Sequence, residues 1–109
     1  MIREEKMMRI FVSEADRWEK QPLYMAIIEL CRERGIKGAT ALRGMAGYGL
    51  HNHLHRDKVL RLSADLPVVI EVIDSEEKLK GMLPEIREMV GDGLITVEKV
   101  EVVAAGKEG

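Results

Sequence analysis

Two strand-helix-strand patterns follow one another along the chain, and this repetition limits the possible folds more than any other feature. β-favouring runs mark the strands, and apolar residues at helical spacing mark the helices. The pattern predicts strands at 6–13, 37–43, 68–73 and 94–103, and a first helix from Pro22 to Gly35. It predicts a second helix that starts at Asp74-Ser75-Glu76-Glu77 and ends at Gly91-Asp92-Gly93. Residues 58–62 are a further short strand or a strand extension.

The ends of both predicted helices carry typical signals. Pro22 suits the first turn of the first helix, where its missing N–H costs nothing, and Gly35 suits a left-handed C-terminal cap. Asp74-Ser75-Glu76-Glu77 is a good start for the second helix, because it offers a capping side chain and acidic residues for the first turn. Pro84 lies inside the second pattern and predicts a kink or a restart.

This order of elements is that of the α+β ferredoxin-like fold, a split βαβ-βαβ arrangement with two helices on one face of an antiparallel four-stranded sheet. At 109 residues the chain forms one domain, 1–109, with a core at about 6–103 and a tail at 104–109. Met8, Ile10 and Val12 share one face of the first strand. Met7, Phe11 and Leu42 are expected on the open sheet face, which predicts an oligomer.

Composition excludes several classes of protein. The net charge of −2 gives no general attraction to nucleic acid or an acidic membrane surface. Phe11 is the only aromatic residue on the four main strands, which disfavours an RNA-binding sheet. Cys31, on the buried helix face, is the only cysteine, and no apolar run is long enough to span a membrane. We therefore expect a cytoplasmic protein that is not embedded in a membrane.

Two glycine-rich turns are the best candidates for a ligand site. Arg43 adjoins the first, which contains Gly44, Gly47 and Gly49. Such a turn either shapes a tight exit from the strand or brings backbone N–H groups to a ligand. The second, Gly91-Asp92-Gly93, is either a helix cap or a ligand-contacting turn. The split βαβ topology should bring both turns to the same end of the molecule.

Three alternating histidines follow the first turn. In an extended chain, His51, His53 and His55 would project from one face and offer imidazoles to Zn²⁺ or Cu²⁺, with Asp57 as a fourth ligand. The alternative is an exposed polar loop that binds metal only adventitiously. The sequence shows no nucleophile-base set, HExxH motif or phosphate-binding GxxxxGK[ST] motif, so we expect no enzymatic activity.

Several motifs together resemble the PII-like family called domain of unknown function 190. They are Arg43-Gly44-x-x-Gly47-Tyr48-Gly49, the run from Leu60 to Glu71, and Val90-Gly91-Asp92-Gly93-Leu94-Ile95. The resemblance implies a homotrimer with inward-facing sheets, and a loop at 45–56 between the second and third strands. It also implies a nucleotide site between subunits, formed by the two glycine turns. Leu94 stands where signalling PII proteins have a lysine, which would remove one phosphate contact.

The sequence thus predicts a PII-like, trimeric sensor that binds a small molecule, an adenine nucleotide being one candidate, and regulates a partner through the loop at 45–56. The resemblance suggests a membrane transport protein as that partner. The predicted ligand-binding residues are Arg43, Gly44, Gly47, Tyr48, Gly49, Gly91, Asp92 and Gly93. The alternative function is divalent metal binding through His51, His53 and His55.

Overall fold

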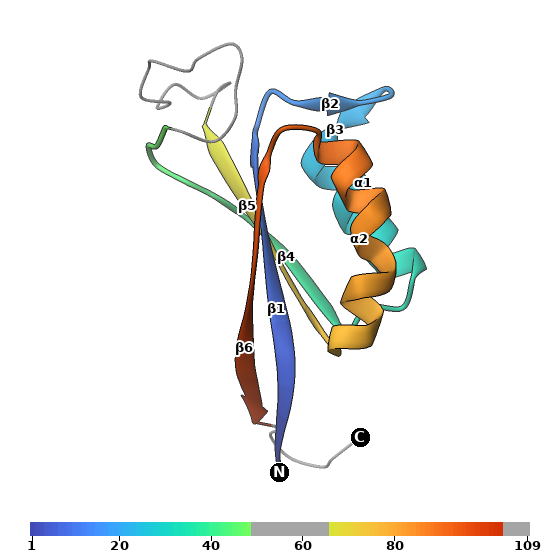
Figure 1. Ribbon diagram of the computed structural model, residues 1–109. Helices are drawn as coiled ribbons and strands as arrows, with labels where there is room; N and C mark the ends of the chain where they lie inside the picture. Colours follow the sequence, from blue (N-terminus) through green and yellow to red (C-terminus); the bar gives the residue numbers. More distant parts are fainter. Residues whose placement is uncertain (49–65, 104–109) are drawn as a thin grey trace.

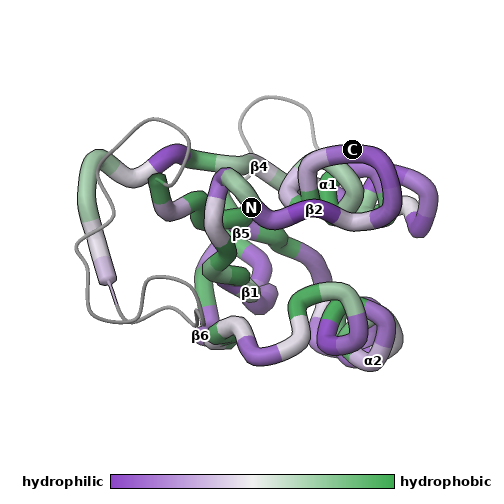
Figure 2. The backbone as a smooth tube through the Cα atoms, turned by 90° about the horizontal axis from the view of Figure 1, so that it is seen from above, coloured by the Kyte–Doolittle hydropathy of each residue, from purple (hydrophilic) through white to green (hydrophobic). Residues whose placement is uncertain are grey.

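Two helices cover one face of a four-stranded antiparallel sheet in the computed structural model, which describes residues 1–48 and 66–103 (Figure 1). The strands of this sheet are β1 (Ile2–Ser13), β4 (Gly38–Arg43), β5 (Pro67–Asp74) and β6 (Leu94–Val103). The helices are α1 (Leu23–Glu33) and α2 (Glu76–Val90). The view from above shows both helices on the same side of the sheet (Figure 2).

The strand order β4-β5-β1-β6 confirms the ferredoxin-like prediction. Each strand-helix-strand unit leaves a gap that a strand of the other unit fills, so β5 lies between β1 and β4. β5 is thereby an inner strand, a position that suits its nearly continuous apolar run Val68 to Ile73. No helix among the described residues is long and apolar enough to cross a membrane.

The core lies between the sheet and the helices. Met8, Ile10 and Val12 are buried on the helix-covered face of β1, as predicted. The main core cluster consists of Met8, Ile10, Val12, Leu23, Ile27, Cys31, Val68, Ile70, Val72, Leu79, Met82 and Ile86. Burial raises the pKa of the Cys31 thiol to about 11, so this cysteine is a small core residue and not a reactive thiolate.

Helix boundaries differ from the predictions in two details. Pro22 is the residue before α1, with an extended backbone, so it lies outside the first turn. α2 runs unbroken through Pro84, and the predicted restart there is wrong. The missing hydrogen bond is offset because Met82 and Ile86, on either side of the proline, are both buried in the core. Gly35 takes a φ of 72° just after α1, as the cap prediction requires.

β1 begins earlier than predicted, at Ile2 instead of residue 6. The extra residues pair only with β6, from Ile2 opposite Val103 to Glu5 opposite Val100. β1 and β6 therefore extend beyond the rest of the sheet as a two-stranded ribbon (Figure 1). No local pattern marks this ribbon, because its pairing depends on a strand at the other end of the described chain.

A short hairpin between β1 and α1 was not predicted. Its strands are β2 (Arg17–Trp18) and β3 (Gln21–Pro22), and two residues, Glu19 and Lys20, form the turn. Trp18 packs against the edge of the core and anchors the hairpin. The backbone N–H of Leu23 donates to the Asp16 carbonyl at 2.8 Å, which joins this segment to the start of α1.

The open sheet face is only partly apolar. The register places Leu42, Val69, Phe11 and Leu94 in one row across the four strands, because directly paired residues share a face. In the next row, the Arg9 guanidinium pairs with Glu71 at 3.1 Å and with Glu98 at 3.3 Å.

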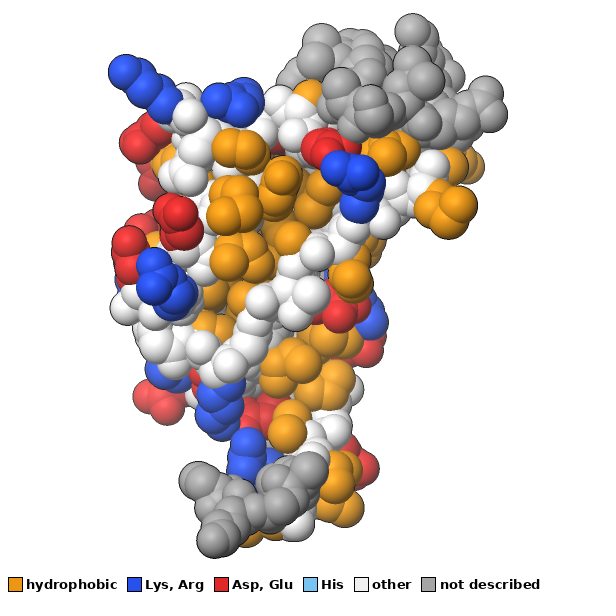
Figure 3. Space-filling view, turned by 180° about the vertical axis from the view of Figure 1, so that it is seen from behind, with side chains coloured by type: hydrophobic (Ala, Val, Ile, Leu, Met, Phe, Trp, Pro, Cys, Tyr) orange, Lys and Arg blue, Asp and Glu red, His pale blue; other side chains and the backbone are white. Residues whose placement is uncertain are grey.

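The exposure of a side chain on the open sheet face depends on whether its strand lies at the edge or in the middle of the sheet. Leu42 on the edge strand is 49% exposed, as expected of an uncovered face. Met7 is buried, contrary to the expectation, because it lies on an inner strand with neighbours on both sides. Figure 3 shows the molecule from the side of β4 and α1, where apolar side chains form a broad band between charged groups.

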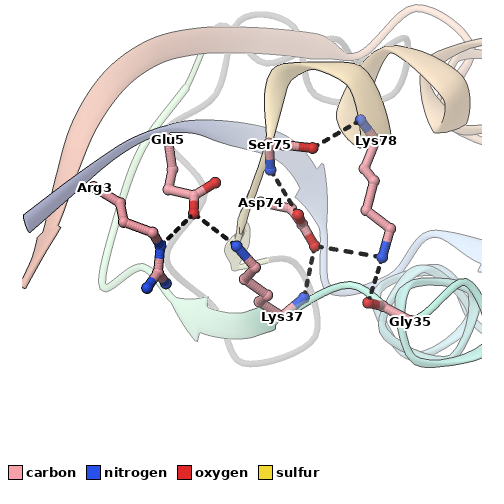
Figure 4. Close-up of polar contacts among 7 residues, drawn as sticks. All are labelled: Arg3, Glu5, Gly35, Lys37, Asp74, Ser75 and Lys78. Carbon is pink, nitrogen blue, oxygen red and sulfur yellow. Dashed lines mark hydrogen bonds and ion pairs between the residues drawn. The ribbon is translucent and has the colours of Figure 1, made fainter. Parts of the chain in front are cut away.

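Two buried carboxylates lie at the end of the sheet that is opposite the glycine turns, and their contacts hold neighbouring elements together (Figure 4). Asp74 accepts the backbone N–H of Lys37 at 2.9 Å and that of Ser75 at 2.6 Å. Glu5 accepts Lys37 Nζ at 2.7 Å and Arg3 Nε at 3.1 Å. These contacts join β1, the start of β4 and the start of α2.

The same contacts set the pKa values of the two acids. Burial alone would raise the pKa of Asp74, but the N–H groups of Ser75 and Lys37 lower it below its ordinary value. Hydrogen bonds from Lys37 and then Arg3 lower the pKa of Glu5. A carboxylate with a lowered pKa stabilises the fold above its unfolded-state pKa, and this contribution is lost as the pH falls through the folded-state value.

We predict that Asp74→Asn lowers the free energy of unfolding at neutral pH by about 1–3 kcal/mol, because one buried N–H loses its acceptor. The loss should shrink as the pH falls through the folded-state pKa of Asp74, which lies below the ordinary value of an aspartate, because the carboxyl group then becomes protonated. Urea unfolding between neutral pH and that value measures both effects. Asp92→Asn, at an exposed turn, is the matched control, and an equal loss in both variants would contradict the role assigned to Asp74.

Candidate functional site

Both glycine turns lie at the same end of the sheet, as the topology predicted. Arg43, at the end of β4, pairs with Val68 near the start of β5. Leu94, at the start of β6, pairs with Phe11 near the end of β1. The first turn therefore leaves the sheet beside its β4 edge, and the second enters it at the opposite, β6 edge.

The distance between the two turns limits what one subunit can do. β5 and β1 separate the edge strands, so the edges are three strand spacings apart, roughly 14 Å. A ligand much shorter than that distance cannot lie against both turns of the same sheet. For such a short ligand, a site that uses both turns needs one turn from each of two copies of the chain.

The first turn is packed tightly against the start of β5. The Gly44 N–H donates to the Pro67 carbonyl at 2.7 Å. A Cβ at Gly44 would lie 2.9 Å from Pro67 Cγ, and one at Gly47 would lie 3.3 Å from the same atom. Neither glycine takes a positive φ. Close approach to Pro67, and not left-handed backbone, explains glycine at these two positions, as in a tight strand-to-loop exit.

Arg43 is held by an acid that the sequence did not single out. Its Nη2 lies 2.5 Å from Glu14 Oε2. The other carboxylate oxygen, Glu14 Oε1, is buried and has no hydrogen-bond partner in the described part of the chain. Glu14 itself is fixed by its N–H, which donates to the Leu66 carbonyl at 2.8 Å. The sequence signal that could have revealed this pair is an acid directly after β1, but only the strand register brings it to Arg43.

Tyr48 is 73% exposed and marks the last described residue of the first turn. Gly49, the three histidines His51, His53 and His55, and the basic residues Arg56, Lys58 and Arg61 lie outside the described residues. The metal-binding prediction therefore stays a prediction. Within residues 1–48 and 66–103, no group of three His, Cys, Asp or Glu side chains has a suitable arrangement for a metal ion.

The second turn combines a helix cap with a close backbone contact. Gly91 takes a φ of 68°, and its N–H donates to the Arg87 carbonyl at 2.9 Å, which ends α2. A Cβ at Gly93 would overlap the Val90 side chain and lie 3.1 Å from the Phe11 carbonyl oxygen. The structure thus explains why glycine stands at both positions. Asp92, exposed between them, is the residue of this turn that can contact a ligand.

The fold is that of PII-like proteins. The chain is 20% identical to CPII from Thiomonas intermedia K12 in a structure with ADP, AMP and acetate, with a TM-score of 0.62 over 95% of this chain and 93% of that one. It is 22% identical to a putative PII-like signaling protein from Thermus thermophilus, with a TM-score of 0.64 over 94% and 92% of the two chains.

The chain belongs to the DUF190 family, described as "Uncharacterized ACR", whose model matches residues 5–102. A UPF0166 protein of Aquifex aeolicus is 46% identical over 98 residues, which cover 90% of this chain and 92% of the relative. A UPF0166 protein of Methanocaldococcus jannaschii is 36% identical over 89% and 90% of the two chains. The resemblance inferred from the sequence motifs is confirmed.

We predict that Gly93→Ala lowers the free energy of unfolding by about 1–3 kcal/mol, because the added methyl group overlaps Val90 and crowds the Phe11 carbonyl. Urea unfolding measures the loss. Gly81→Ala is the control: a Cβ there meets nothing within 4 Å, and alanine in a helix should stabilise by about 0.5–1 kcal/mol. A Gly93→Ala variant as stable as the parent would contradict the packing described for this turn.

Proposed function

We propose that this protein is a homotrimeric, PII-like sensor that does not catalyse a reaction and works in the cytoplasm. A small ligand, for which an adenine nucleotide is our candidate, binds between subunits. One wall of each site is the turn that contains Arg43, Gly44, Gly47, Tyr48 and Gly49, and the other is the Gly91-Asp92-Gly93 turn of a neighbouring copy. The loop at 45–56 then changes its contacts with a partner protein, for which a membrane transporter is our candidate.

The observation that carries this proposal is the position of the two turns at one end, but at opposite edges, of the same sheet. This arrangement leaves each turn as half a site that a second copy can complete. The solved structures of CPII with ADP and AMP support a nucleotide as the first ligand to test. The apolar row on the open sheet face supports the assembly that the site needs.

The Glu14–Arg43 pair gives the proposed site a defined charge in its empty state. Arg43 is 60% exposed at its side chain, so it is accessible to an anionic ligand. Its present partner is a carboxylate, which any phosphate would have to replace. If Arg43 released Glu14, the Oε2 atom of Glu14 would lose this partner, in addition to Oε1, which already has none among the described residues. Ligand binding and the local structure around Leu66 and Pro67 are therefore coupled through this acid.

We predict that ADP binds the parent protein and that Arg43→Ala lowers its affinity about tenfold, the usual effect of losing one charge-assisted hydrogen bond. Glu14→Gln should raise the affinity, because it removes the competing charge. Isothermal titration with ADP, AMP and ATP measures all three proteins. An absence of binding at millimolar nucleotide would reject the nucleotide. Equal affinities in the parent and Arg43→Ala would remove Arg43 from the site.

We also predict a particle of three times the 12.3 kDa chain mass by light scattering. Leu42→Lys, on the apolar row of the open sheet face, should shift the particle toward monomer without unfolding it, because the side chain is 49% exposed in one copy. Glu77→Lys, on the solvent side of α2, is the matched control. A monomeric parent protein would contradict a site shared between copies.

A further inference from the structure

A groove runs between the two helices on the outer surface of the molecule, away from the sheet. The β2–β3 hairpin closes one end of it, and its volume is about 270 Å³. The residues that line it are Trp18, Glu19, Gln21, Ala26, Glu29, Leu30, Glu33, Glu85, Glu88 and Met89. None of these residues belongs to the two glycine turns, so the groove is independent of the proposed ligand site.

The floor of the groove is apolar. Ala26 is buried, and Trp18, Leu30 and Met89 are half-buried and pack against the edge of the core. The indole at one end and the two aliphatic side chains along the floor form a continuous apolar strip. A strip of this kind favours an apolar side chain from a partner over a purely hydrated ion.

The rim of the groove is acidic. All five charged residues of the lining are glutamates, one from the hairpin, two from α1 and two from α2. Glu85 is bound by the Arg34 guanidinium. The other four, Glu19, Glu29, Glu33 and Glu88, have no ion-pair partner within residues 1–48 and 66–103.

Apart from Arg34, which binds Glu85, no cation forms an ion pair with this rim within residues 1–48 and 66–103. Arg17, in the hairpin, donates through Nη2 to the Lys20 carbonyl at 3.1 Å, a contact inside the hairpin itself. The whole chain has a net charge of only −2. The four glutamates without an ion-pair partner therefore make the groove much more negative than the chain as a whole. Such a surface repels anionic lipid and nucleic acid and attracts a positively charged partner.

We propose that this groove docks a lysine- or arginine-rich amphipathic helix of a partner protein. The apolar face of such a helix would lie on Trp18, Leu30 and Met89, with its cations between the glutamates of α1 and α2. From Ala26 to Glu33 the α1 wall is roughly 10 Å long, enough for about two turns of a docked helix. This interaction goes beyond the proposed function, because it needs neither nucleotide nor the loop at 45–56.

Trp18 makes the proposal directly testable, because it is the only tryptophan in the chain and lies in the groove. The probe is a synthetic peptide of about 14 residues with leucine on one helical face and lysine on the other. Its titration should shift the Trp18 emission with saturation, and raising the salt concentration should weaken binding. A twin peptide with glutamate in place of lysine should leave the emission unchanged.

Charge reversal then locates the binding. Glu29→Lys with Glu88→Lys places cations on both walls, and we expect the affinity for the lysine peptide to fall by about tenfold or more. Glu101→Lys, on β6 and outside the groove, is the matched control and should bind like the parent. Urea unfolding of each variant distinguishes lost binding from lost folding.

Glu19 supplies a second variant that separates binding from stability. It takes a φ of 59°, a conformation that asparagine adopts more easily than glutamate. Glu19→Asn should therefore fold at least as stably as the parent and yet bind the lysine peptide more weakly. Unchanged affinity in both groove variants would overturn the proposal. Equal binding of a scrambled lysine-leucine peptide without an apolar face would also overturn it, since that result indicates a simple cation-attracting patch.

Discussion

The antiparallel pairing of β1 with β5 is the contact on which the rest of the structure depends. It runs from Lys6 opposite Asp74 to Ser13 opposite Pro67 and forms the centre of the sheet. β4 and β6 each join only one of these two strands, and both helices pack on the apolar face that the pair presents. A shift of β5 by one residue in this register would turn Ile70 and the other core residues of β5 to the open face, while Ile10 stayed in the core.

The two ends of the β1–β5 pair differ in how their polar groups are bonded. At the Asp74 end, the buried carboxylates of Asp74 and Glu5 accept hydrogen bonds that hold the crossover connections in place. At the Pro67 end, glycines press against the proline, and Glu14 keeps one buried oxygen without a partner among the described residues. The Asp74 end, whose carboxylates are hydrogen-bonded, provides rigidity. At the Pro67 end, a ligand can alter the hydrogen bonding of Glu14.

Much of the architecture could be predicted from the sequence, because it follows from local patterns. The periodicity around Leu23 and Ile27 and the alternation around Ile10 predicted the correct elements and buried faces. Errors occurred where a distant segment decides the outcome. β1 extends to Ile2 because β6 reaches it, and Met7 is buried because β1 is an inner strand. The hairpin around Trp18 was missed, since a two-residue strand has no measurable periodicity.

For the candidate site, the sequence by itself determined the family, the positions of the two glycine turns and their approximate place at one end of the fold. These depend on residue types in order, which local chemistry and topology rules can interpret. Only the tertiary structure decided what those residues touch. It showed that Pro67 packs closely against Gly44 and Gly47 and that Glu14 holds Arg43. It also showed that five glutamates from three segments line one apolar groove. Contacts between residues far apart in the chain depend on strand register and helix packing, and no local pattern records them.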